Sequence, residues 1–153
     1  MRRSPPTLRL ELARRVRAWA PPRRELTRWV RAALGRRGTG ALALAVVGAP
    51  ESRRLNARYR GHDRATNVLS FPAAPVRGAA RALGDLVICP SVLAREARAQ
   101  AKPLRAHWAH LVVHGTLHLL GYDHVRDADA RRMERREVRV LRALGFANPY
   151  RAL

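Results

Sequence analysis

The chain has 153 residues, enough for one domain with a substantial buried core. Hydrophobic residues make up 47% of it, yet the longest apolar run, Ala41–Val47, is far too short to cross a membrane. The single cysteine, Cys89, excludes an internal disulfide. The arginine-rich N-terminus lacks the apolar region of a signal peptide, so we expect a mature protein of the reducing cytoplasm.

Basic residues dominate the charge of the chain. Lysine and arginine number 31 against 11 acidic residues, which gives a formal net charge of +20 at pH 7. Such a charge favours a polyanionic partner, because clustered guanidinium groups release counterions from a phosphate backbone. Lys102 is the only lysine. This skew is also typical of a compositional bias towards arginine, so charge supports nucleic-acid binding without establishing it.

Apolar periodicity, glycine and proline divide the chain into alternating strands and helices. The order predicts one α+β domain over residues 1–153, in which a small mixed sheet of about four strands packs with about five helices. In chain order, the segments are strand Thr7–Leu12, helix Arg24–Leu34, strand Ala41–Val47, helix Glu51–Tyr59, strand Thr66–Phe71, loop Ala73–Leu83, strand Gly84–Cys89, and helices Pro90–Gln100, Pro103–Leu120 and Asp127–Leu144.

The stretch WAHLVVHGTLHLLGYDH, residues 108–124, carries the strongest chemical signal. His114 and His118 are four residues apart, so a helix places both imidazoles on one face, about 6 Å apart along its axis. The helix can end at Gly121, which lets the chain reverse and return His124 to the other two. Three neutral imidazoles leave the fourth position of a Zn²⁺ ion open, as in catalytic zinc sites. The spacing therefore predicts a metal site at the end of a central helix.

Two other histidines of the same predicted helix, His107 and His110, compete for this role. His110, His114 and His118 are evenly spaced, but residues eight apart lie about 12 Å apart along a straight helix. Nitrogens that share one zinc ion lie only about 3 to 3.5 Å apart. One ion can take two of these three, so we expect His107 and His110 to pack, to support a ligand or to face RNA.

The spacing HxxxHxxGxxH also matches the zinc motif of the metzincin proteases. Those enzymes carry a glutamate directly after the first histidine as general base. This chain has Gly115 there. Asp123 is as well suited to orienting a ligand as to replacing that base. A metalloprotease is therefore a less favoured alternative.

Three ordered segments together resemble one known family. The segment LRAHWAHLVVHGTLHLLGYDH, which ends at His124, closely resembles the signature of the YbeY endoribonucleases, also called rRNA maturation factors. Leu55–Pro72 (LNARYRGHDRATNVLSFP) and Leu83–Pro90 (LGDLVICP) are similar to the family's other two characteristic segments, and LGFANPY resembles its usual ending. The resemblance covers about residues 40–150, and the N-terminal third is generic.

The resemblance implies a metal-dependent, single-strand-specific endoribonuclease of rRNA processing, notably 16S 3′-end maturation, and of ribosome quality control. Matched by position, His114, His118 and His124 would bind one Zn²⁺ per chain, and Arg60 would be the functional arginine beside the metal cleft. The implied partners are ribosomal or single-stranded RNA, the small ribosomal subunit and its assembly factors, with no membrane and no small-molecule cofactor. A guanidinium suits Arg60, since it can hold a phosphate bidentately and stabilise developing charge.

Residues outside the histidine motif carry weaker signals. Asp85, in the strand GDLVIC, is the acid that best fits water activation or ligand orientation, although capping a turn explains it equally well. Asn67 and Ser70 are expected either to line the cleft or to form hydrogen bonds at a strand end. The chain departs from the family at His62, where lysine is common, and in its last helix, which is basic where many relatives are acidic.

Two functions from different classes remain open. The first is a metal-dependent RNA hydrolase. The second is a non-catalytic ribosome-assembly or RNA-binding factor in which zinc holds the fold. An open coordination position favours the enzyme, because structural zinc sites are normally closed by four protein ligands.

Overall fold

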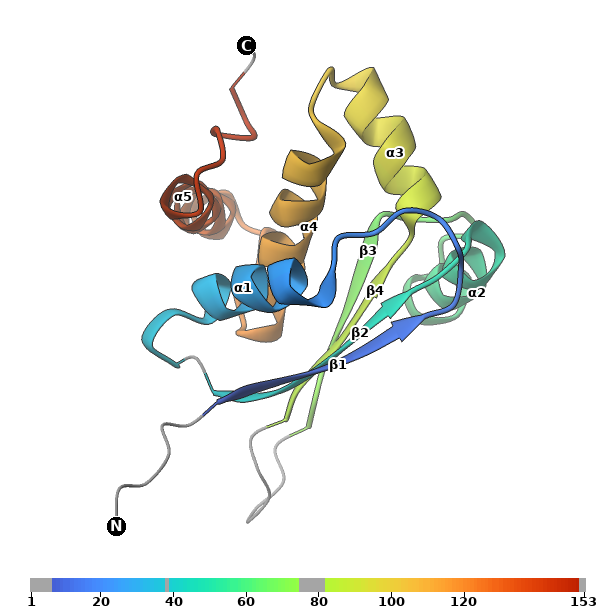
Figure 1. Cartoon of the computed structure of the whole chain (residues 1–153), viewed down its shortest axis with the longest axis horizontal. Coiled ribbons are helices and arrows are strands. Elements are labelled where there is room, and N and C mark those ends of the chain that lie inside the picture. The colour runs from blue at the N-terminus through green and yellow to red at the C-terminus, as the bar shows by residue number, and fades with distance from the viewer. Residues whose placement is uncertain (1–6, 38, 75–81, 152–153) are drawn as a thin grey trace.

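The computed structural model describes residues 7–37, 39–74 and 82–151. Within these ranges, one mixed sheet of four strands packs with five α-helices (Figure 1). This confirms the predicted α+β domain. The elements are β1 (Leu8–Arg14), α1 (Arg23–Leu34), a 3₁₀ turn η1 (Gly35–Arg37), β2 (Gly40–Val46), α2 (Ala49–Arg60), β3 (Val68–Pro72), β4 (Ala82–Ile88), α3 (Pro90–Ala99), α4 (Leu104–Leu119) and α5 (Asp127–Ala143).

The sheet has the order β1-β2-β4-β3, in which β1, β2 and β4 are parallel and β3 runs antiparallel to β4. β4 begins two residues earlier than predicted, because Ala82 already pairs with Ala41 of β2. Residues 75–81 of the predicted loop lie outside the described residues. Successive side chains of a strand point to opposite faces. Leu42 and Leu44 of β2 are therefore buried beneath helices, whereas Ala43 between them faces the other side.

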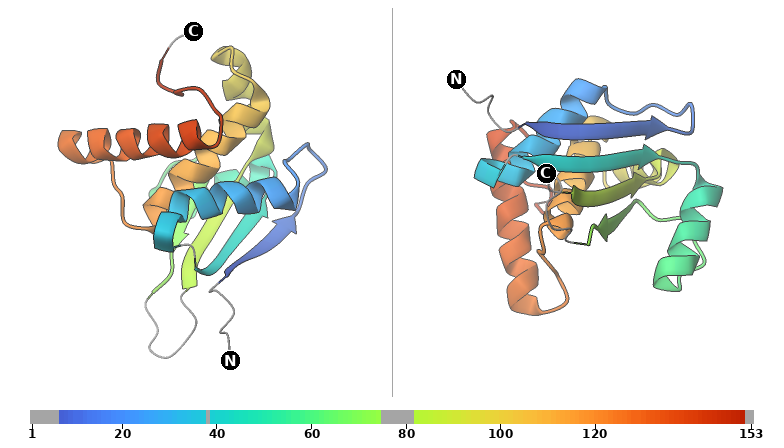
Figure 2. Two further views of the ribbon diagram at one scale, coloured as in Figure 1. Left: turned by 60° about the vertical axis from the view of Figure 1, so that its left-hand side comes forward. Right: turned by 90° about the horizontal axis from the view of Figure 1, so that it is seen from below.

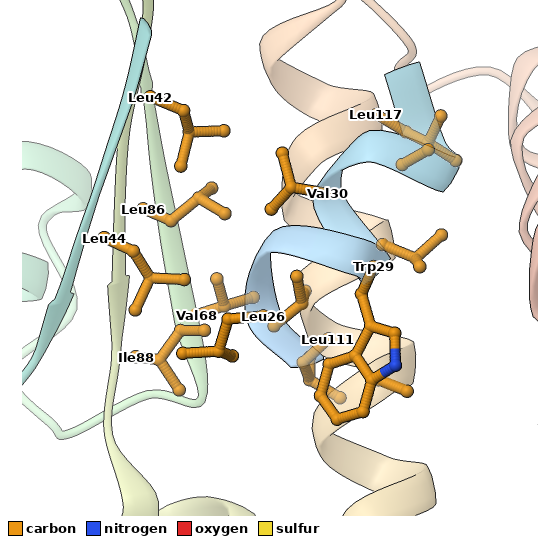
Figure 3. Packing of buried hydrophobic residues seen from close by; sticks show 14 of the residues in the cluster. Leu26, Trp29, Val30, Leu42, Leu44, Val68, Leu86, Ile88, Leu111 and Leu117 are labelled. Carbon is orange, nitrogen blue, oxygen red and sulfur yellow. The ribbon is translucent and has the colours of Figure 1, made fainter. Parts of the chain in front are cut away.

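The hydrophobic core fills the space between this covered face and helices α1 and α4 (Figure 3). Leu26 of α1 points towards the sheet, whereas Trp29 lies on the other side of α1 and packs on Phe146. Leu111 of α4 is buried with them. α4 is buried on most of its surface, which explains why its sequence is apolar on several sides. α5 packs on α4 on the side away from the sheet (Figures 1 and 2).

α2 lies at the opposite side of the molecule from α5 (Figure 1). Its buried residues are polar, namely Ser52 and Asn56. Ser52 Oγ donates a hydrogen bond to the Thr66 carbonyl and accepts one from the Thr66 amide, while Asn56 donates to the Arg64 carbonyl. α2 is therefore tied to the segment that follows it by hydrogen bonds more than by apolar packing.

Three further residues are buried in this framework. Cys89 is a free, buried thiol, and Trp108 and Met133 are core residues. No helix of the described residues is long and apolar enough to cross a membrane.

Candidate metal centre

The end of α4 and the turn after it bring three histidines together. His114 and His118 lie one helical turn apart on α4. Gly121 follows with φ of +97°, a backbone conformation that glycine adopts readily, and its amide donates to the His118 carbonyl at 3.0 Å. The chain then reverses and returns His124 to the helix, as the sequence spacing predicts.

The three imidazoles converge on one point. The Nε2 atoms of His114 and His118 are 3.2 Å apart. The ring of His124 lies 4.9 Å from that of His118 and 5.9 Å from that of His114, measured between centroids. One nitrogen from each residue lies within 4.8 Å of the other two. This arrangement could hold one metal ion.

His114 and His118 are spaced as two nitrogen ligands of one tetrahedral metal ion would be, and His118 is neutral. Tetrahedral bonds of 2.0–2.1 Å place two ligand nitrogens about 3.3 Å apart, close to the separation of the two Nε2 atoms. Burial, followed by the neighbouring His114 and His124, lowers the pKa of His118 to about 4. His118 is therefore neutral at pH 7 and keeps a lone pair for a metal. Among the residues that the structure describes, no fourth histidine, cysteine or carboxylate joins this cluster.

A buried carboxylate on α5 supports the cluster. Glu137 is 0% exposed, and its Oε1 lies 2.5 Å from Nδ1 of His114. Its Oε2 lies 3.1 Å from Nε2 of His110 and accepts a hydrogen bond from the Tyr150 hydroxyl. Burial alone would raise the pKa of Glu137, but the hydrogen bonds outweigh it and lower the pKa to about 2. The ionised carboxylate keeps a proton on Nδ1 of His114, which leaves the Nε2 lone pair free for a metal.

Sequence reasoning missed Glu137, although a signal was present. It stands in the buried stripe of α5 with Met133, Val140 and Leu141. An acid at helical spacing within such a stripe requires buried partners. Tyr150, near the end of the described chain, was also missed as a contributor to this network.

The two rival histidines lie beside the cluster. His107 is buried, and its Nε2 lies 3.0 Å from Glu96 on α3. His110 contacts Glu137 and the Tyr150 hydroxyl. Both histidines therefore contact residues beside the cluster and do not belong to it, as predicted. They line a cleft of 730 Å³ that leads to His114.

Asn67 and Ser70 are occupied by hydrogen bonds near β3. The Asn67 amide donates to both carboxylate oxygens of Glu96 at 3.2 Å, and its Oδ1 accepts from the Val68 amide. Ser70 donates to the Gly115 carbonyl at 3.2 Å. Asn67 also lines the cleft beside His114, so both predicted roles apply to it.

Gly115, directly after the first histidine, faces the sheet. A Cβ at this position would lie 2.8 Å from Cδ2 of Leu86 and 3.2 Å from Cγ2 of Val68. No side chain fits there without displacing the core. A general-base glutamate of the metzincin kind therefore has no place at this position.

The structure does not bring Asp85 to the histidines. Its neighbour Leu86 points towards α4, where it meets Gly115, so Asp85 points to the opposite face of the sheet. There it lines a cleft with Ala43 and Phe71. The catalytic role predicted for Asp85 is not supported, because the sheet separates it from the cluster.

Arg60 is the last residue of α2, and its side chain is exposed. Among the described residues, no hydrogen bond or ion pair links it to the three histidines. Its proposed role therefore rests on its position in the YRG segment and not on a contact.

The fold and site define a small α+β protein with a candidate three-histidine metal centre. A family model described as Endoribonuclease YbeY matches residues 18–145. The Endoribonuclease YbeY of Alkalilimnicola ehrlichii is 54% identical over 154 residues, which cover 95% of this chain and 93% of that protein. This chain belongs to the endoribonuclease YbeY family, as its three motifs predict.

A solved structure shares the fold. The solution structure of a Thermotoga maritima protein matches with a TM-score of 0.55 over 95% of this chain and 99% of that one. Sequence identity is 22%, so this likeness concerns the fold alone.

Proposed function

We propose that this protein is a metal-dependent endoribonuclease that cleaves single-stranded RNA in rRNA processing, including 16S 3′-end maturation, and in ribosome quality control. The convergence of His114, His118 and His124 on one point carries the proposal. Membership of a family described as endoribonucleases supplies the substrate class. The proposed ion is one Zn²⁺ per chain, and the proposed setting is the small ribosomal subunit and its assembly factors in the cytoplasm.

The chain's own residues prepare the site for phosphodiester cleavage. A bound zinc ion would supply Lewis acidity, which polarises a phosphoryl oxygen and lowers the pKa of a coordinated water. Glu137 fixes the tautomer and the orientation of His114 through Nδ1. Arg60 is proposed to hold a phosphate of the substrate, because a guanidinium stabilises developing negative charge.

Two observations favour an RNA hydrolase over the alternatives. Structural zinc is normally closed by four protein ligands, whereas three histidines form the cluster in the described part of the chain. The packing of Gly115 against Leu86 disfavours a metalloprotease, since it removes the position of the general base. The remaining alternative is a non-catalytic assembly factor, which an RNA cleavage assay distinguishes from a hydrolase.

The test compares His114→Ala with wild type on a labelled single-stranded oligoribonucleotide in the presence of Zn²⁺. His62→Ala, which changes an exposed histidine of the α2–β3 connection, is the matched control. We expect wild type and the control to cut the single strand but not its duplex, and His114→Ala to be inactive although folded by circular dichroism. Cleavage by His114→Ala at the wild-type rate would contradict the proposal. Zinc-loaded wild type that binds the RNA without cutting it would favour the assembly factor.

A further inference from the structure

A second cleft adjoins the metal centre on the α1 side of α5. It has a volume of 620 Å³ and lies between the end of α1, the turn after α4 and the first half of α5. Three arginines line it, Arg36 from η1 and Arg132 and Arg136 from α5. We call it the arginine cleft. Tyr122 and Asp123 also line it, and the next residue along the chain is His124.

The arginines of this cleft have no acidic partner among the described residues. Within residues 7–37, 39–74 and 82–151, no ion pair joins any of the three to a carboxylate, although Asp123 and Asp129 line the same cleft. Asp123 is engaged with its own turn, since its Oδ1 accepts the His124 amide at 2.7 Å. Ion pairs do form at four arginines elsewhere, namely Arg9, Arg15, Arg53 and Arg105. The positive charge of the cleft is therefore not compensated by an ion pair within the described residues, as holds for most arginines of a chain with 31 basic and 11 acidic residues; what distinguishes the cleft is that three of them line one hollow beside the histidine turn.

Two of these guanidinium groups are held against other parts of the structure. The guanidinium carbon of Arg132 lies 5.8 Å from the centre of the Tyr122 ring. Nη2 of Arg136 lies 2.9 Å from the point that a Cβ would occupy at Gly35. The absence of a side chain at Gly35 thus makes room for a half-buried cation. Cations held close together without counter-ions favour an anion between them.

Further arginines of α5 line a separate cleft, together with Glu134. Arg131, Arg135 and Arg139 are exposed and spaced four residues apart. Like charges at this spacing destabilise an isolated helix. A polyanion that neutralises several of them together would remove this repulsion, which a single small anion would not.

We propose that the arginine cleft binds the phosphate backbone of single-stranded RNA whose reacting phosphate lies at the histidines. The inference rests on the proposed function, in that RNA is taken as the substrate. Tyr122 is two residues from His124, a span of at most about 7 Å of chain. A strand that reaches the metal centre can therefore also reach the cleft. Phosphate contacts of this kind position the strand without reading its sequence.

The experiment measures RNA binding separately from cleavage. Anisotropy of a fluorescein-labelled oligouridylate is titrated with the full chain in EDTA over a series of KCl concentrations. The test variant is R132Q/R136Q. The matched control, R54Q/R58Q, removes two exposed arginines with the same spacing from α2, on the other side of the molecule. R132K/R136K keeps the charge, and R132Q alone serves if loss of the half-buried Arg136 lowers the melting temperature.

We expect R132Q/R136Q to lower the salt slope of binding by about 1.4, since each phosphate contact of a single strand contributes about 0.7. Its affinity should fall about tenfold or more at moderate salt, while R54Q/R58Q and R132K/R136K change it much less. An unchanged slope, or an equal loss in R54Q/R58Q, would overturn the inference. If the protein cleaves RNA normally and R132Q/R136Q leaves the salt slope unchanged, RNA binding by the arginine cleft is refuted and the proposed enzymatic function still holds. If R132Q/R136Q lowers the salt slope as expected but the wild-type protein does not cleave RNA, the proposed enzymatic function is refuted and RNA binding by the arginine cleft still holds.

Discussion

Replacing Glu137 tests whether the buried carboxylate prepares the metal centre. Three donors point at it, from His114, His110 and Tyr150. Glutamine keeps the shape but offers one acceptor oxygen and an N–H₂ group, so Glu137→Gln leaves at least one donor facing another. Nδ1 of His114 then loses its fixed charge partner, and the tautomer that aims Nε2 at the metal is less favoured.

The expected effect is on metal affinity. Loss of a carboxylate that orients a ligand histidine weakens binding by about 10- to 100-fold, or about 1.4 to 2.7 kcal/mol. We expect Glu137→Gln near the lower end and Glu137→Ala near the upper end. Glu134→Gln makes the same charge change on an exposed residue of the same helix and is the control. Affinity is measured by competition with a chromophoric zinc chelator at pH 7.5.

The zinc titration has a result that would refute this reasoning. If Glu137→Gln binds zinc as tightly as wild type and Glu134→Gln, then Glu137 does not orient His114. Unfolding of the metal-free variants in urea provides a second readout. Removing one partner of a buried charged network destabilises the fold, so weaker zinc binding is assigned to the lost orientation of His114 only if the metal-free variant is still folded without urea.

Three further predictions concern other parts of the molecule. Arg60→Glu should impair RNA cleavage without loss of bound zinc, because Arg60 is exposed and, among the described residues, no hydrogen bond or ion pair links it to the histidines. A wild-type rate, with zinc measured by atomic absorption, would contradict its role. Gly115→Val should destabilise the fold by about 1–3 kcal/mol in urea, since its Cβ would meet Leu86; an unchanged midpoint would contradict this packing. Burial lowers the pKa of His107 below 6.5 despite its hydrogen bond to Glu96. As pH falls, His107 is therefore protonated in the unfolded chain before it is protonated in the folded protein. The metal-free protein should consequently lose stability as pH falls below about 6.5. His107→Gln should show a smaller loss between pH 7.5 and 5.5, and an identical loss would contradict this reading.

The fold was largely predictable because its signals are local. Each strand and helix is marked by its own apolar period and by glycine or proline at its end, as at Gly121. The histidine cluster was predictable for the same reason, since His114, His118 and His124 lie within one helix end and one turn. Spacing alone therefore gave both their shared face and the reversal of the chain.

The parts that sequence reasoning missed depend on tertiary packing. Glu137 reaches His114 from another helix, 23 residues away along the chain, and no local pattern specifies that contact. The role predicted for Asp85 fails for a different reason. The alternation in GDLVIC shows which residues share a face of the sheet, but the face on which the histidines lie is decided by the packing of α4. In the structure, Leu86 and Ile88 are buried on the face covered by the helices, and Asp85 is exposed on the other face.

The most direct test of the central claim is RNA cleavage by metal-depleted protein before and after one equivalent of Zn²⁺ is restored. The histidine centre predicts no cleavage of a labelled single-stranded RNA by the depleted protein and recovery that saturates at one ion per chain. His114→Ala should not recover. Cleavage that persists in the depleted protein, or recovery in His114→Ala equal to that of wild type, would contradict a metal-dependent ribonuclease built on these three histidines.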